Sequence, residues 1–402
     1  MDFTFTEEQR AAEEAAGAVF AGVSPDDVPS PALTGGAVAE DFDRALWGRL
    51  AAADLLSLYG PAEQGGAGLG PLALCLVLRE AGQVLARVPL LETGAAALTL
   101  TAVGGPVAAR LLPLIGRGEL TVTAASSGRT GHDPAELAVT ARPVPGEPGG
   151  WLLDGVQTAV PWAAGTDLIL LPARTLEQPA EPAHEQPNTA GGAGRGGGGG
   201  EGPLLAFVSR DRPGVTLADQ VSTNGERYGE LHLDSVRLTG EEVITTAGAW
   251  ERLRGLLTIG TCALALGVGT AVSRMTGAYT AKREQFGFPI ATFQAVAVQA
   301  ADRYIDLRAM EATLWQAAWR LESGADGALP VAADLAVAKV WASEGVRRIV
   351  QTAQHLHGGF GADTTYALHR YHAWAKQLEL SLGSAGAHEE ALGDLLAAHP
   401  LG

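Results

Sequence analysis

The chain has 402 residues, of which 47% are hydrophobic, and a formal net charge of -17 at pH 7. This composition predicts folded domains with a large buried core and excludes a disordered chain. The acidic balance argues against a nucleic-acid surface, because phosphate binding needs clustered lysine and arginine. The two cysteines, Cys75 and Cys262, lack metal-ligand spacing and support neither a disulfide framework nor a zinc site.

The N-terminal segment carries acidic residues, Asp2, Glu7 and Glu8, where a signal peptide has lysines. We find no apolar run that reaches the roughly 18 to 20 residues of a membrane span. Together with the low cysteine content, these features predict a cytoplasmic protein with no membrane partner.

The first 118 residues have the pattern of helices. Thr6 and Gln9 have the spacing of a capping box, which starts a helix. The run 42–60 places leucines near one face and ends at a Gly-Pro pair. The apolar stretch 71–103 predicts one or two buried helices. We therefore expect an N-terminal all-α domain over residues 1–118.

Short runs rich in β-branched residues begin at residue 119, separated by proline, glycine and aspartate. Strands at this spacing are typical of a small β-barrel or sandwich, which we predict for residues 119–242. Residues 175–202 within it are dominated by glycine and proline. Polyglycine cannot bury apolar surface, so we expect a mobile surface loop there. The loop lacks the Gly-Lys-Ser/Thr ending of a phosphate-binding loop.

Long helical patterns rich in small residues return in residues 243–402, which predicts a C-terminal four-helix bundle. One break between helices, AKREQFGFPIATFQAV at 281–296, carries Arg283, Phe286 and Gln294 in addition to the glycine and proline that a turn requires. The fold class is therefore α+β with three domains.

This order of domains, with three motifs, resembles the flavin-dependent acyl-CoA dehydrogenase family over nearly the whole chain. The motifs are Pro-x-x-x-Gly-Gly-x-Gly at 61–68, RxxFGxPIxxFQ at 283–294 and HLHGGFGADTTYALHRY at 355–371. The family binds FAD between subunits and oxidises the Cα–Cβ bond of an acyl-CoA thioester. A base removes the Cα proton while the Cβ hydride passes to the flavin. The resemblance thus implies FAD, an acyl-CoA substrate and an electron-transferring flavoprotein as electron acceptor.

The resemblance implies a set of contacts to FAD at the helix break. Arg283 and Phe286 match positions that contact the pyrophosphate and adenosine end, and Gln294 matches a further contact. Arginine suits a pyrophosphate because its planar fork donates paired, charge-assisted hydrogen bonds. The alternative is that Arg283 is a surface cation and Phe286 a core residue.

A second set of contacts is implied by the HGGFG sequence. Gly358, Gly359 and Gly361 match a glycine turn that approaches the FAD of the adjacent subunit. Glycines permit close backbone approach to a phosphate. His355 stands where the family commonly has glutamine. The alternative is an ordinary turn between two helices. No metal site is implied.

The β region departs from the family pattern. The stretch 125–141 replaces the segment that faces the flavin, and Ser126, Ser127 and Asp133 are only loosely comparable to its residues.

The family's Trp-Ile-Thr motif, which packs on the flavin ring, is also absent. Ala159 and Pro161 stand at its tryptophan and threonine positions. Trp162 lies close by, but strand alternation predicts that it points to the opposite face, and the alternative is a one-residue slip that would reverse this direction.

The catalytic base is missing from both positions that the family uses. The commonest base position falls on Leu382, directly before Gly383, and the alternative position falls on Leu257. Glu379 and Glu251 are the candidate substitutes, and the alternative is that both are solvated carboxylates on helix surfaces.

These features resemble one group within the family, the base-lacking subunit of heterotetrameric steroid-type acyl-CoA dehydrogenases. The first hypothesis is such a subunit, contributing half of an FAD site to an enzyme for a bulky acyl-CoA such as a steroid-CoA. A second hypothesis is a self-sufficient homomeric enzyme with a relocated glutamate. A third is a flavin-free structural or regulatory homologue.

Overall fold

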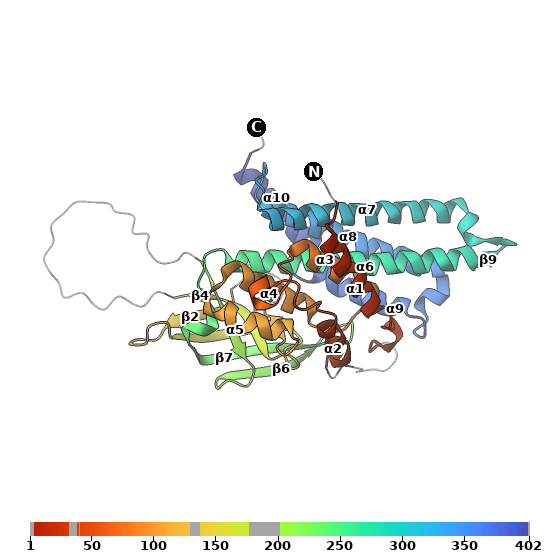
Figure 1. Cartoon of the computed structure of the whole chain (residues 1–402). Coiled ribbons are helices and arrows are strands. Elements are labelled where there is room, and N and C mark those ends of the chain that lie inside the picture. The colour runs from red at the N-terminus through yellow and green to blue at the C-terminus, as the bar shows by residue number, and fades with distance from the viewer. Residues whose placement is uncertain (1–3, 32–37, 40, 129–136, 177–201, 401–402) are drawn as a thin grey trace.

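The computed structural model of the chain has helices first, then strands, then helices again (Figure 1). This order agrees with the predicted α+β organisation. The glycine-rich segment predicted as a mobile loop lies, apart from its ends, outside the described residues, as does Asp133. The structure describes residues 4–31, 38–39, 41–128, 137–176 and 202–400.

The first helix begins at the cap that the sequence predicts. The Thr6 hydroxyl accepts a hydrogen bond from the Gln9 backbone N–H at 3.2 Å, and the Gln9 side chain accepts one from the Thr6 N–H at 3.0 Å, confirming the capping box. The region comprises α1 (Glu7–Phe20), η1 (Pro25–Asp27), α2 (Arg44–Ala52), η2 (Ala62–Gln64), α3 (Pro71–Gln83), α4 (Leu90–Val103) and α5 (Gly105–Gly116).

The middle region is one eight-stranded sheet with strand order β6-β7-β3-β2-β4-β5-β8, and β1 pairs with β4. The order has two ends, at β6 and β8, so the described strands form an open sheet and do not close by hydrogen bonding into a barrel. The strands are β1 (Val122–Ala124), β2 (Val139–Pro143), β3 (Trp151–Pro161), β4 (Leu168–Thr175), β5 (Leu204–Ser209), β6 (Val215–Val221), β7 (Arg227–Leu238) and β8 (Val243–Ile244), with η3 (Gly240–Glu242) before β8.

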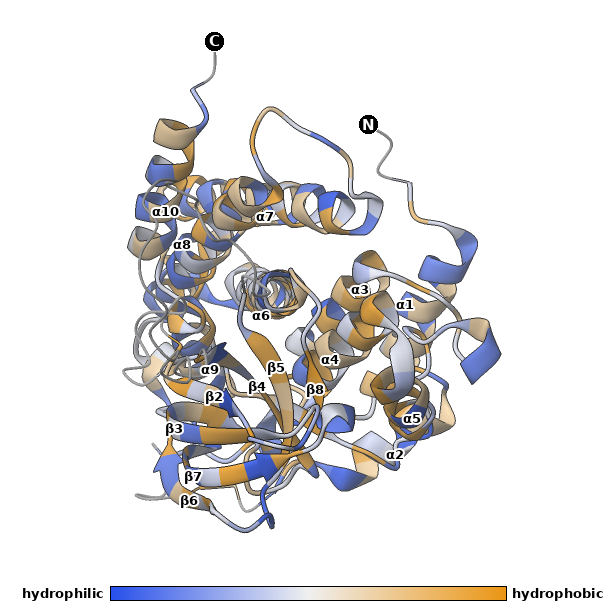
Figure 2. Cartoon of the chain, turned by 90° about the vertical axis from the view of Figure 1, so that its left-hand side faces the viewer, coloured by the Kyte–Doolittle hydropathy of each residue, from blue (hydrophilic) through white to orange (hydrophobic). Residues whose placement is uncertain are grey.

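Alternate residues of the central strands enter two different cores. In β5, Leu205 and Phe207 join the large core shared with the helices, whereas Leu204, Ala206 and Val208 join a smaller core inside the sheet region. Successive side chains of a strand point to opposite faces, so a strand that is apolar throughout must be covered on both sides. The sheet is thereby anchored to the helices (Figure 2).

The C-terminal region is a bundle of long helices. Figure 2 looks along α6, which lies at the centre with α3 and α4 on one side, α7 above and α8 on the other side. The elements are α6 (Ala249–Lys282), β9 (Glu284–Gln285), β10 (Phe288–Pro289), η4 (Ile290–Thr292), α7 (Gln294–Ser323), α8 (Val331–His357), η5 (Gly358–Ala362), α9 (Leu368–Leu380) and α10 (Ala385–Ala398).

Helix α6 is long and apolar enough to cross a membrane by length and composition, contrary to the sequence reading that no run reaches that length. Its most apolar 18-residue window has a mean hydropathy of 1.8, and 89% of that window is buried inside the protein. A helix that is apolar all round is expected at the centre of a large core. Burial therefore accounts for the composition of α6.

Two glycines let α3 approach α6 closely. A Cβ atom at Gly267 would overlap the backbone carbonyl oxygen of Arg79, and one at Gly82 would overlap that of Leu264. Glycine has no side chain, so the two backbones can pack directly against each other. This contact fixes α3 on α6.

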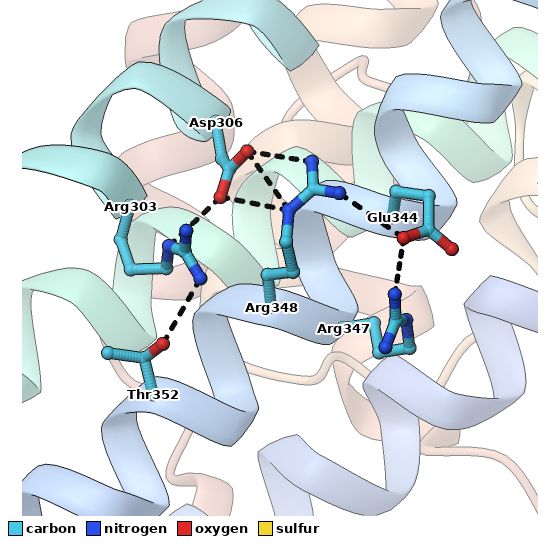
Figure 3. Close-up of polar contacts among 6 residues, drawn as sticks. All are labelled: Arg303, Asp306, Glu344, Arg347, Arg348 and Thr352. Carbon is cyan, nitrogen blue, oxygen red and sulfur yellow. Dashed lines mark hydrogen bonds and ion pairs between the residues drawn. The ribbon is translucent and has the colours of Figure 1, made fainter. Parts of the chain in front are cut away.

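A network of ion pairs joins α7 to α8 (Figure 3). Arg348 donates to both carboxylate oxygens of Asp306 at 2.7 to 3.2 Å, and Arg303 pairs with the same carboxylate at 2.9 Å. Arg348 also reaches Glu344 at 3.2 Å, and Arg303 donates to the Thr352 hydroxyl at 3.2 Å. The Asp306 side chain is only 8% exposed, so its charge depends on the two arginines.

We predict that Asp306→Ala lowers the free energy of unfolding by about 3 kcal/mol, because two guanidinium groups then lose their shared partner. The control is Glu311→Ala on the same helix, which removes the partially exposed pair with Arg308 and should cost less than about 1 kcal/mol. Urea unfolding followed by circular dichroism measures both. Equal losses of unfolding free energy in the two variants would contradict the role of Asp306 as the shared partner of Arg303 and Arg348.

Candidate active site

A cavity of about 600 Å³ lies where the N-terminal helices, the sheet and the bundle meet. Its walls come from α3, α4, β1, the end of β3, the middle of α6, and the end of α9 with the residues after it. Ser126 and Ser127, which the sequence compares loosely with a flavin-facing segment, are among the lining residues. The cavity is within the size range of about 300–1,000 Å³ that is typical of small-molecule sites.

Both positions at which the resemblance places a catalytic base line this cavity, and both are leucine. Leu257 contributes from α6, and Leu382 contributes from the segment after α9. The two candidate substitutes do not line the cavity. Glu379 pairs with Lys376 at 2.7 Å, and Glu251 is exposed in the first turn of α6.

The segment that carries Leu382 is held by a buried lysine. Lys339 of α8 donates to the backbone carbonyls of Leu378 and Glu379 at 3.2 and 3.0 Å and to the Ser343 hydroxyl at 2.7 Å. The lysine therefore satisfies carbonyl groups at the C-terminal end of α9. Burial lowers the pKa of Lys339 to about 8.

Trp162 lines the cavity together with Ala159 and Pro161, which corrects the prediction that it faces the opposite side of the strand. Regular alternation fails here, because the pairing of β3 with β7 shifts between Gln157 and Val160. Ala159 and Trp162 also have positive φ angles of 52° and 55°. These irregularities turn both residues toward the cavity.

Glu92, a residue that the sequence analysis did not single out, lines the same cavity from the first turn of α4. Only 9% of the residue is exposed. Burial raises the pKa of the carboxyl from 4.5 to about 7, while hydrogen bonds from its own backbone N–H and from the Trp162 side chain act in the opposite direction. A single carboxylate within the apolar run VPLLETGAAAL was the signal that could have revealed it.

A second cavity carboxyl group belongs to Glu226. Arg87 donates to its two oxygens at 2.5 and 3.2 Å. Burial raises the pKa of Glu226, and Arg87 opposes that change. Burial also raises the pKa of Tyr228 well above its usual value of 10, and the nearby carboxyls of Glu92 and Glu226 add to the effect. Glu92, Glu226 and Tyr228 therefore lie near one another in the cavity wall.

A separate groove of about 490 Å³ lies at the far end of α6. It brings together Arg283, His355, Gly358 and Gly359 from the two sets of predicted FAD contacts. Within the described part of the chain, the Arg283 side chain forms no ion pair. Its charge is thus available to a phosphate group.

The glycines of the HGGFG sequence have different roles. Gly358 has a φ of 61°, and a Cβ atom at Gly358 or Gly359 would meet no neighbour within 4 Å. Side chains there would occupy the open groove. A Cβ at Gly361, by contrast, would contact the Gln354 carbonyl oxygen at 2.6 Å, so Gly361 is explained by packing within the chain.

Phe286 and Gln294 lie outside this groove. Phe286 is 90% exposed and sits with Gly287 in the two-residue turn between β9 and β10, where both have positive φ. A bulky residue at positive φ is strained, and strain of this kind is concentrated at functional sites. Gln294, the first residue of α7, is also exposed. In Figure 1 this hairpin projects beyond the ends of α6 and α7.

Helix α6 connects the two sites. Leu264 lines the cavity and Tyr279 lines the groove. The two positions are fifteen residues apart, and at 1.5 Å per residue this offset corresponds to about 22 Å. The cavity and the groove are therefore two distinct places on the molecule.

Two family descriptions match the chain. Residues 6–119 match the acyl-CoA dehydrogenase N-terminal domain, and residues 240–396 match the acyl-CoA dehydrogenase C-terminal domain. The chain is 33% identical over 408 residues to acyl-CoA dehydrogenase FadE27 of Mycobacterium tuberculosis, covering 100% of both chains. The chain belongs to the acyl-CoA dehydrogenase family. Members of this family are FAD-dependent oxidoreductases that act on the CH–CH bond of an acyl-CoA.

Two solved structures share this fold at similar identity. A variant of the Tcur3481–Tcur3483 steroid ACAD has a TM-score of 0.83 and 34% identity, with 98% of each chain covered. The ChsE4–ChsE5 complex from Mycobacterium tuberculosis has a TM-score of 0.84 and 31% identity, with 100% of each chain covered. Butyryl-CoA dehydrogenase from Megasphaera elsdenii, at 19% identity and a TM-score of 0.80, shares the fold alone.

The cofactor of the family is FAD, and the groove fits its adenosine diphosphate end. An arginine without an ion-pair partner in the described residues and two glycines that leave open space meet the needs of its pyrophosphate.

We predict that Glu92 makes the protein less stable as pH rises. Its pKa is raised from 4.5 to about 7 in the folded state, so the folded protein binds more protons between these values. The free energy of unfolding should fall across that window by up to about 3 kcal/mol. Urea unfolding at pH 5 and pH 8 measures the change.

Glu92→Gln should remove this fall, because glutamine does not titrate. Glu14→Gln, at an exposed position of α1, is the matched control and should keep the pH profile of the natural chain. If the stability of Glu92→Gln depends on pH as that of the natural chain does, Glu92 is not the group that causes the fall.

Proposed function

We propose that the chain is the base-lacking subunit of a heteromeric acyl-CoA dehydrogenase. In this proposal its groove binds the adenosine diphosphate end of an FAD whose flavin lies in the cavity of a paralogous subunit. Bound FAD accepts the hydride from Cβ of the acyl-CoA while a base takes the Cα proton. This chain supplies Arg283 to the cofactor, and the paralogue supplies the base.

The observation that carries the proposal is the pair of leucines at the two base positions. Leu257 and Leu382 both line the cavity, and neither side chain can accept a proton. A base must lie within hydrogen-bonding reach of the proton that it removes. The carboxylates at Glu379 and Glu251 do not line the cavity, so they offer poor replacements.

The separation of groove and cavity supports the same proposal. The groove, measured at Tyr279, lies about 22 Å along α6 from this chain's own cavity, measured at Leu264. The groove therefore suits a cofactor that is shared with a neighbouring subunit better than one that is bound within this chain alone.

An exposed apolar surface suits an oligomer. Hydrophobic residues of the hairpin and of the first half of α7 are 53–90% exposed, and large apolar patches on a protein mark interaction sites. We propose that a paralogous acyl-CoA dehydrogenase subunit covers this surface. The residues are Phe286, Phe288, Val298, Tyr304 and Ile305.

The names of two similar structures support the proposed partner, a paralogous subunit, and the proposed class of substrate. One is called a steroid ACAD, and the other is a complex of ChsE4 with ChsE5. We therefore propose a bulky acyl-CoA, such as a steroid-CoA thioester, as the substrate. An electron-transferring flavoprotein is the proposed electron acceptor, and the cytoplasm the proposed location.

The test is to purify the chain alone and together with a paralogue that carries a glutamate at the position of Leu382. We expect acyl-CoA to bleach the flavin of the mixed enzyme only.

Arg283→Ala in this chain should lower FAD retention and activity of the mixed enzyme at least tenfold, although the base is elsewhere. Arg117→Ala, at an exposed arginine paired with Glu119, is the control and should change neither. Full bleaching by the chain alone would refute the proposal.

One observation favours a second candidate, a self-sufficient homomeric enzyme. Glu92 is a carboxylate in the cavity, and burial brings its pKa to about 7, which suits a general base. If this candidate holds, the chain alone retains FAD and acyl-CoA bleaches it, and Glu92→Gln reduces the bleaching rate at least a hundredfold. Unchanged bleaching in Glu92→Gln would exclude Glu92 as the base.

A further inference from the structure

The cavity wall combines apolar side chains with several polar ones. Leucines from α3, α4 and α6 form much of the apolar wall. One set of its polar residues comprises Glu92, Asn224, Glu226 and Tyr228, and Ser126, Ser127, Thr261, Gln377, Ser381 and Ser384 also line the cavity. Pockets of this kind bind an apolar ligand and use a few polar groups to orient it. The set that contains Glu92 is therefore a candidate for ligand selection.

Two residues of this set already have partners within the chain. Arg87 occupies both oxygens of Glu226, and the Asn224 side-chain oxygen accepts the Glu226 backbone N–H at 3.1 Å. Glu92 differs, because it forms no ion pair with any cation of the described residues. A carboxylate offers about four acceptor positions. Hydrogen bonds from its own backbone and from Trp162 leave Glu92 with free acceptor capacity.

Trp162 is held in a strained conformation next to Glu92. Its φ is 55°, and its backbone carbonyl accepts hydrogen bonds from the N–H groups of Gly165 and Thr166 at 2.9 and 3.1 Å. Its ring packs edge-on against Phe42 with 6.5 Å between the centroids. A bulky residue at positive φ persists only where its surroundings fix it. The Trp162 donor is thus a fixed support for the Glu92 carboxyl group.

We propose that Glu92 accepts a hydrogen bond from a hydroxyl group on the apolar body of the ligand, so that the cavity selects hydroxylated over plain hydrocarbon ligands. This inference goes beyond the proposed function, because there the acyl-CoA meets the flavin in the paralogue's cavity and this chain's own cavity is left for a separate apolar ligand. A carboxylate at the same point of the ligand is disfavoured, because Glu92 and Glu226 are both acidic. A hydrocarbon leaves the buried Glu92 without the additional donor.

The test uses the full chain and two steroids that differ by one hydroxyl group, androstanol and androstane. Equilibrium dialysis measures their dissociation constants. The natural chain should bind androstanol at least about tenfold more tightly, since a hydrogen bond to a charged group contributes about 1.5–3 kcal/mol. Glu92→Leu should reduce the ratio to about one. Glu14→Gln, at an exposed glutamate of α1, is the matched control and should keep the ratio.

A further variant separates the role of Glu92 from an effect on folding. Trp162→Phe removes the neighbouring donor and keeps the carboxyl group, so the preference for androstanol should persist. Circular dichroism checks that each variant is folded. If Glu92→Leu does not fold, Glu92→Gln replaces it, and the ratio should then fall at least threefold.

Three results would overturn the inference: equal binding of the two steroids by the natural chain, a preference that survives loss of the carboxylate, or no binding of either steroid. None of them bears on the proposed subunit role, because that role is measured by FAD retention and activity of the mixed enzyme.

Discussion

The direct packing of α3 against α6 is the constraint on which both sites depend. Gly82 and Gly267 allow the two backbones to meet without intervening side chains. Helix α6 is buried for most of its length, so its position is determined by the helices around it. Once α3 is fixed, Leu78 and Leu257 face the same cavity from two different regions of the sequence.

Because α6 is a single rigid element, it also sets the distance between the cavity and the groove. An α-helix has a fixed rise per residue, so about 22 Å separate the two sites. This separation is the physical basis of the proposed composite FAD site. A cofactor end bound at Arg283 leaves the cavity of the same chain open for other contacts, including contacts with Glu92.

Backbone strain is concentrated where function is proposed. Ala159, Trp162 and Leu382 have positive φ and line the cavity, and Phe286 has positive φ at the tip of the exposed hairpin. Non-glycine residues adopt this conformation at a cost of about 1–3 kcal/mol each. The irregular backbone re-aims these side chains, which is why simple strand alternation gave the wrong direction for Trp162.

The sequence by itself determined the types of element, the family motifs and the leucines at both base positions. Those features depend on local periodicity, capping residues and short motifs, which are encoded over a few neighbouring residues. Only the tertiary structure decided that Trp162 and Glu92 line one cavity, that Arg283 and His355 share a groove and that Phe286 lies outside it. These relations join residues distant in the chain, and they arise from close helix packing and strand irregularities that no local pattern records.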